Sequence, residues 1–261
     1  MRDNDQVGIY RDDAIVLRTQ KLGEADRIVT LLARRAGRIR AVAKGVRRTK
    51  SRFGARLEPF THVDLLLYTG RSLDVITQAD TVRPYGKPFA TDYPRYTAGT
   101  AMLETAEKFT PVEKEPAMRQ FLLLVGGLRA LGEGVHDPRL VLDAYLLRSL
   151  AVAGFAPALD ECAVCGTRAA DPDDAQTSGG RRAFWFSVGA GGLVCQDCRA
   201  PGAATPSAQT IALMGALMRG DWAHADASER RHQAECSGLV AAYLQWHLEN
   251  AIRSLRHVEH A

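Results

Sequence analysis

The chain has 261 residues, of which 46% are hydrophobic and 25% are charged, and its formal net charge is +4. This composition is that of a globular protein, long enough for two domains or for one domain with a small inserted module. It excludes disordered, collagen-like and coiled-coil chains. The first residues are too polar for a signal peptide and the apolar runs are too short to span a bilayer, so we expect a soluble, cytoplasmic protein.

Positive charge is concentrated at the amino end. Residues 1–82 contain 16 lysines and arginines against 10 acidic residues, whereas the rest of the chain contains 18 against 20. A block of one charge sign repels itself and is typical of a surface that binds a polyanion. Ten basic residues with no acidic residue among them are therefore the candidate nucleic-acid contacts: Arg34, Arg35, Arg38, Arg40, Lys44, Arg47, Arg48, Lys50, Arg52 and Arg56. A solvated protein surface is the alternative.

Residues 1–82 have the pattern of short strands separated by tight turns. Basic and apolar residues alternate from position 38 to 44, so one face of that strand is cationic and the other is buried. Five short antiparallel strands suit a small closed barrel, of which the OB-fold is the best-known nucleic-acid-binding example. The predicted strands are residues 13–18, 27–32, 38–43, 61–68 and 73–79, with a loop rich in glycine, serine and arginine at 45–56.

Three aromatic residues, Phe53, Phe60 and Tyr68, lie in or near the basic stretch. Exposed on a barrel, they could stack on nucleic-acid bases. Buried, they would belong to the barrel core. The sequence leaves both interpretations open.

Beyond residue 82 the apolar period becomes helical. It predicts helices over residues 96–109, 117–131, 138–153, 207–218 and about 231–255, with Gly132 and Gly154 as stop signals. The predicted fold class is therefore α+β. A barrel in residues 1–82 precedes a helical domain in two parts, 83–161 and 199–261, with a small module inserted at 162–198.

Four of the five cysteines form two Cys-x-x-Cys pairs, Cys162 with Cys165 and Cys195 with Cys198, separated by 29 residues. Each pair offers two sulfurs from one tight turn, which is half of a tetrahedral zinc site. A predicted hairpin over residues 183–195 delivers the second pair after a solvated loop at 171–182. One structural Zn²⁺ per chain is therefore expected, in preference to a redox role. The fifth cysteine, Cys236, is expected to be buried on a helix.

Motifs for catalysis are absent from the sequence. It has no phosphate-binding Gly-x-x-x-x-Gly-Lys motif, no Gly-x-Ser-x-Gly, and no Gly-x-Gly-x-x-Gly that opens a helix. A hydrolytic nuclease would need clustered carboxylates for Mg²⁺, and the acidic residues are dispersed. We therefore expect a protein that is not an enzyme. A zinc-ribbon transcription or translation factor that binds RNA through the barrel is an alternative.

The runs 14–19, 23–32, 37–48 and 50–60 together resemble the amino-terminal signature of the RecO family of bacterial DNA repair proteins. The likeness continues through residues 73–79 and the cysteines that follow Gly154-Phe155-Ala156-Pro157. It implies an OB-fold and a helical domain with inserted zinc-binding cysteines, in a nucleoid-associated recombination mediator. Such proteins bind single- and double-stranded DNA and anneal complementary strands without ATP. With RecR they help load RecA onto DNA coated with single-stranded DNA-binding protein (SSB).

The same resemblance implies recognition of the acidic, Phe-ending tail of SSB. Such a peptide needs an apolar pocket with arginines at its rim. On the predicted helices, the candidate partner-binding residues are Arg129, Arg139 and Arg148.

Overall fold

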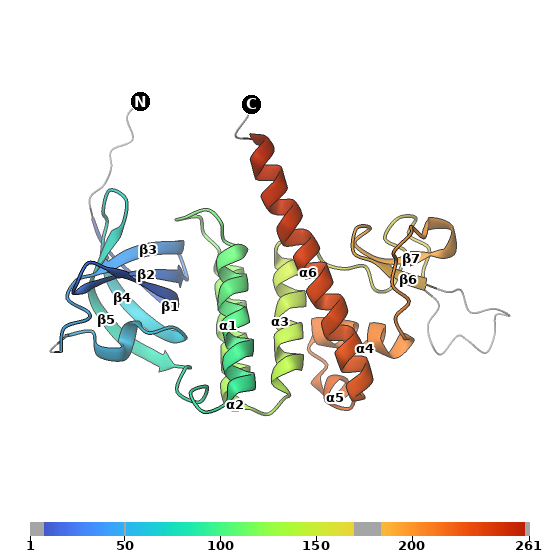
Figure 1. The fold of residues 1–261 in the computed structure, drawn as a ribbon, viewed down its shortest axis with the longest axis horizontal. Coiled ribbons are helices and arrows are strands. Elements are labelled where there is room, and N and C mark those ends of the chain that lie inside the picture. Colours follow the sequence, from blue (N-terminus) through green and yellow to red (C-terminus); the bar gives the residue numbers. More distant parts are fainter. Residues whose placement is uncertain (1–7, 50, 170–183, 259–261) are drawn as a thin grey trace. The chain divides into compact units, whose positions relative to one another are not determined.

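The computed structural model describes residues 8–49, 51–169 and 184–258, with side chains up to residue 248 (Figure 1). It divides into two compact units, residues 1–138 and residues 139–261. The predicted boundary at residue 82 lies inside the first of these units. In the described residues, no helix is long and apolar enough to cross a membrane.

The first unit begins with a closed barrel in which neighbours follow the order β1-β2-β3-β5-β4. Its strands are β1 (Ile9–Leu22), β2 (Asp26–Ala33), β3 (Gly37–Ala43), β4 (Thr61–Tyr68) and β5 (Asp74–Pro84). All five predicted strands are confirmed, and this is the OB-fold expected from the sequence. The prediction that all strands pair antiparallel is wrong for β3 and β5. Because β4 pairs with β1, β5 lies beside β3 and runs parallel to it. The two strands pair at only two positions, Ala41 with Asp74 and Val42 with Val75.

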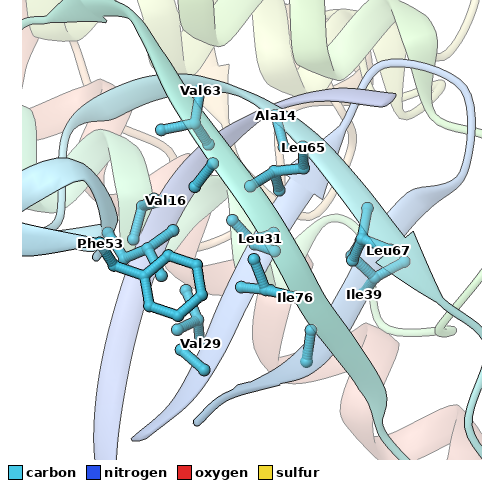
Figure 2. Packing of buried hydrophobic residues seen from close by; sticks show 14 of the residues in the cluster. Ala14, Val16, Val29, Leu31, Ile39, Phe53, Val63, Leu65, Leu67 and Ile76 are labelled. Atoms are coloured by element: carbon cyan, nitrogen blue, oxygen red, sulfur yellow. The ribbon is translucent and has the colours of Figure 1, made fainter. Parts of the chain in front are cut away.

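Alternating burial builds the barrel core. Along β3, every second residue is buried, as the alternation of basic and apolar residues predicts. Figure 2 shows side chains such as Leu31 and Ile76 meeting inside the barrel, with Phe53 packed among them. Phe53 and Leu57 come from the loop that contains a short 3-10 helix, η1 (Gly54–Leu57). Full burial of one such side chain contributes about 1.5–3 kcal/mol.

Two helices complete the first unit, α1 (Tyr93–Lys108) and α2 (Met118–Glu133). The side chain of Asp92 caps α1 by accepting a hydrogen bond from the backbone N–H of Arg95 at 3.0 Å. The predicted stop at Gly132 is wrong, because α2 continues through it. The helix ends at Gly134, whose φ of 65° is the left-handed conformation that glycine adopts without strain.

Helices and a hairpin form the second unit. Its elements are α3 (Pro138–Val152), β6 (Phe184–Ser187), β7 (Gly192–Cys195), η3 (Gln196–Cys198), α4 (Ala208–Arg219), α5 (Trp222–Asp226) and α6 (Arg230–Val258). The predicted hairpin is confirmed, whereas α5 is too short to give a periodic signal. Buried Cys236 on α6 is confirmed. The predicted loop at 171–182 lies outside the described residues.

Candidate metal centre and nucleic-acid interface

The four paired cysteines converge at one point of the second unit. Cys162 and Cys165 lie on a turn beyond α3, Cys195 ends β7, and Cys198 ends η3. The hairpin holds the two turns together, because the backbone N–H of Ala163 donates to the carbonyl of Leu193 at 2.7 Å. Local turns and one long-range pairing therefore bring the sulfurs together.

The sulfur positions fit a metal ion. All four Sγ atoms lie within 4.8 Å of one another, and those of Cys165 and Cys195 are 3.7 Å apart. A tetrahedral zinc site with Zn–S bonds of about 2.3 Å places sulfurs about 3.8 Å apart. The backbone N–H of Cys195 also points at Cys162 Sγ, at 3.4 Å. The four sulfurs are therefore close enough together to bind one metal ion.

Electrostatics at the cluster favour a bound cation. Burial opposes ionisation of Cys162, but backbone N–H groups of Cys165 and Cys195 directed at its sulfur lower its pKa to about 6. Hydrogen bonds with the sulfurs of Cys165 and Cys195 raise the pKa of Cys198 to about 12. Four adjacent thiolates are not stable together without positive charge, and a dication supplies it.

The ten candidate DNA-binding residues do not share one surface. Arg34 and Arg35 lie at the turn between β2 and β3, whereas Lys44 to Arg56 follow the far end of β3. Seven residues of β3 separate the two groups, a distance of about 23 Å at strand rise. The run that is continuous in sequence is therefore divided along the length of a strand.

Arg38 and Arg40 lie between the two groups, and their side chains form bonds with other residues of the protein. The side chain of Arg38 is 12% exposed and donates to the carbonyls of Thr110 and Pro111 at 2.6 and 2.5 Å. Arg40 pairs with Glu113 at 2.5 Å. These partners lie on the segment that joins α1 to α2, here called the 110–116 connector. No sequence pattern indicates this contact, because the connector has no periodic pattern.

The 110–116 connector lies against the edge of β3. The backbone N–H of Lys114 donates to the carbonyl of Arg38 at 2.8 Å, and the Lys114 ammonium lies 3.0 Å from Asp74, a fully buried carboxylate. A Cβ atom on Gly37 would lie 1.7 Å from the carbonyl oxygen of Glu115, so only glycine permits this approach. The connector covers the part of β3 that β5 leaves unpaired.

The 44–56 loop, in contrast, leaves its charges exposed. Lys44, Arg48 and Arg52 are exposed and form no ion pair with the residues that the structure describes. Arg47 donates to the carbonyls of Gly23 and Glu24, bonds that leave its charge uncompensated. Arg56 bonds in the same way to the carbonyl of Arg52. Lys50 lies outside the described residues.

The remaining candidates have separate positions. Arg35 lies 3.5 Å from Asp12, and Arg34 is exposed. Phe53 is buried in the barrel core, which confirms the core interpretation for that residue. Phe60 is also buried, but its ring packs against Phe89 and Tyr96 outside the barrel cluster, whereas Tyr68 is 42% exposed.

The three candidate partner-binding arginines belong to different units. Arg129 lies on α2, 3.8 Å from Glu133, whereas Arg139 and Arg148 lie on α3. Arg139 is exposed. Arg148 is half-buried and donates to the carbonyl of Leu217 through two nitrogens, at 3.1 and 2.7 Å. Burial lowers its pKa. Arg148 therefore has an internal role in joining α3 to the end of α4.

Together, these features define a class: an OB-fold barrel, a helical region and a cluster of four cysteines. Two family models match the sequence of the chain. "Recombination protein O N terminal" matches residues 7–85, and "Recombination protein O C terminal" matches residues 90–256. The chain belongs to this family, whose members act in DNA repair and recombination. The family boundary lies near the predicted one at residue 82.

Curated relatives are similar to this chain over almost its full length. The chain is 67% identical to the DNA repair protein RecO of Thermobifida fusca, over 98% of this chain and 100% of the relative. It is 61% identical to that of Streptomyces avermitilis, over 97% and 100%, and 55% identical to that of Frankia casuarinae, over 97% and 99%.

Proposed function

We propose that the chain is a recombination mediator that binds single- and double-stranded DNA and anneals complementary strands without a nucleotide. The observation that carries the proposal is the 44–56 loop, an exposed basic segment without carboxylates at the end of an OB-fold barrel. Family membership supports the role in DNA repair. The protein acts without a catalytic step of its own.

Annealing follows from charge neutralisation on this loop. Two strands repel each other in water, and a cationic surface that binds both phosphate backbones lowers that repulsion. Base pairing then supplies the free energy, so no nucleotide is hydrolysed. Contacts to phosphates carry little sequence preference. The cysteine cluster holds one structural Zn²⁺, which orders its module and takes no part in pairing.

The salt dependence of binding tests the loop. If about six cations engage a single strand, the logarithm of the association constant falls with the logarithm of salt concentration with a slope of roughly −4. Replacing Lys44, Arg48 and Arg52 together with alanine should flatten the slope by about 2 units and slow annealing. The fold should persist, because all three side chains are exposed.

A matched variant controls for net charge. Arg219, Arg230 and Arg231 are exposed arginines of the second unit, and their replacement removes the same three charges. This control variant should have the same salt slope of DNA binding and the same annealing rate as the unmodified protein. An equal loss in both triple variants contradicts the loop as the DNA-binding surface. Tighter binding to structured RNA, or metal-dependent cleavage of DNA, contradicts the proposed function.

Family membership supports a proposal for the partners. With RecR, the protein helps RecA onto SSB-coated single strands, and it binds the SSB tail through exposed arginines of its helices. Arg129 and Arg139 are the accessible candidates, since Arg148 is bound to Leu217. Replacing either residue with glutamate should weaken the binding of a labelled tail peptide to the full chain. Unchanged peptide affinity in both variants contradicts this placement.

A further inference from the structure

We infer that Tyr93 and Tyr96, at the start of α1, form a platform on which unpaired bases of single-stranded DNA stack. The inference rests on the proposed function and adds to it a second contact surface outside the barrel. This surface distinguishes single strands from duplex. The 44–56 loop by itself binds phosphates of either.

Both tyrosines are unusually exposed. Tyr93 is 78% exposed and Tyr96 is 48% exposed, whereas Tyr145 and Tyr243 in the second unit are almost fully buried. Residues three apart on a helix lie on the same face, so Tyr93 and Tyr96 share one face of α1. An aromatic ring left in water has a free π-face that a base can cover.

Packing against the barrel holds the platform in place. The ring of Tyr96 meets Phe60 edge-on at 5.7 Å between centroids, and Phe60 meets Phe89 in the same way at 5.3 Å. Gly99 on α1 leaves the space for Phe60, since a Cβ there would lie 3.0 Å from its ring. Tyr96 is thus fixed on one side by a buried aromatic residue and open on the other.

This packing joins the platform to the basic loop. Phe60 follows the last cation of the loop, Arg56, by four residues, so their Cα atoms are at most about 14 Å apart. The loop leaves the barrel beyond β3, and β5 ends at Pro84, paired with Thr61 at the start of β4. In Figure 1, η1 and the start of α1 accordingly lie at the same end of the first unit.

The charge around the platform is complementary to DNA. Arg83, Lys87 and Arg95 lie between Asp80 and Glu104, a stretch whose only acidic residue is Asp92. Arg83, near the end of β5, and Lys87, on the linker that precedes α1, are both exposed. Cations beside exposed rings are the combination that binds single strands without sequence preference.

The surroundings of the rings favour a nucleic acid over an apolar protein partner. The next residues along this face, Thr97 and Thr100, bond their hydroxyl groups to helix carbonyls at 2.8–3.0 Å. The rings therefore stand among polar and basic groups and not within a continuous apolar patch, as a protein interface core requires. In a duplex the bases are already stacked on one another, so no base is free to stack on the tyrosine rings.

Tyr93→Ala in the full-length protein is the main test, because this ring is the most exposed and its loss should not affect folding. We expect affinity for a single-stranded oligonucleotide to fall about tenfold, or about 1.4 kcal/mol, as for one base stacked on an aromatic residue. Duplex affinity and the salt slope should be unchanged. Tyr93→Phe should restore binding, because the π-face is restored.

Trp246→Ala is the matched control, since Trp246 is 43% exposed but lies on α6 of the second unit. It should leave single-strand affinity unchanged. The inference is overturned if Tyr93→Ala leaves single-strand affinity unchanged, if duplex affinity falls equally, or if Trp246→Ala has the same effect. Unchanged affinity with a changed oligomeric state would assign the platform to a protein contact instead.

The loop variant separates the two proposals. If replacement of Lys44, Arg48 and Arg52 weakens binding but Tyr93→Ala does not, only the platform is wrong. If neither variant affects DNA binding, the proposed function itself is contradicted.

Discussion

The barrel and the cysteine module order β-structure in different ways. All five strands of the barrel contribute to one buried cluster, which the loop residues Phe53 and Leu57 complete. The module has a two-stranded sheet, and its buried cluster consists of Cys162, Val194 and Cys195. Two-stranded hairpins are marginal in water, so the module has little apolar burial of its own, and the proposed zinc would stabilise it where burial stabilises the barrel.

In the barrel, the residues that stabilise the fold are therefore not the residues that are proposed to bind DNA. Because its interior supplies the stability, its loops and outer face can carry unpaired charge. In the module, two of the four cysteines, Cys162 and Cys195, are themselves part of the buried cluster. Variants of each region should therefore fail in different ways.

Removal of the metal should have the largest effect. Zinc-binding free energy at such sites is on the order of 10 kcal/mol and couples directly to folding of the module. A strong chelator, or Cys165→Ser, should increase hydrogen exchange in the hairpin and leave the barrel protected. Freshly purified protein should contain one zinc per chain by elemental analysis. Much less than one would reject the site.

A cavity in the barrel core should have the next largest effect. Leu31 is fully buried, so Leu31→Ala should lower the free energy of unfolding by about 2–5 kcal/mol. Urea unfolding measures this change, and DNA binding should fail together with the fold while zinc content stays constant. Leu122→Ala on α2, where the side chain is half exposed, should change stability by less than about 0.5 kcal/mol. Similar costs for both variants would contradict the barrel packing.

Gly37→Ala should detach the 110–116 connector. The new methyl group would clash with the carbonyl of Glu115, and a φ of 71° strains any residue with a side chain. The expected cost is on the order of 1–3 kcal/mol. Faster hydrogen exchange should be confined to the connector and β3. A variant as stable as the parent would show that the connector does not contact β3 closely.

Glu113→Gln should give the smallest effect. Arg40 and Glu113 are both partly exposed, and surface ion pairs contribute about 0–1 kcal/mol, so stability should hardly change. Release of Arg40 should add about one phosphate contact and steepen the salt slope by about 0.7. A flatter slope would mean that the connector helps DNA binding and does not compete with it.

The sequence predicted those features that depend on local pattern. Alternation along residues 38–44 identified β3, and the spacing of Cys162, Cys165, Cys195 and Cys198 identified the cluster. Local pattern does not contain pairings between distant residues. The parallel contact of Ala41 with Asp74 and the pairing of Arg40 with Glu113, 73 positions away, arise only when the barrel closes. For this reason the basic run appeared as one surface in the sequence.

The 110–116 connector also means that the barrel can be completed only late in synthesis of the chain. Residues 1–85 contain every strand of the barrel, yet β3 meets β5 at only two residue pairs, and its remaining edge is covered by residues made some 70 positions later. A nascent chain released at residue 90 would thus expose an open strand edge, which is prone to pair with other chains. Ribosome-bound chains of increasing length should resist protease only once the connector has emerged. The amino-terminal barrel, made first, is then finished by a segment from between two helices.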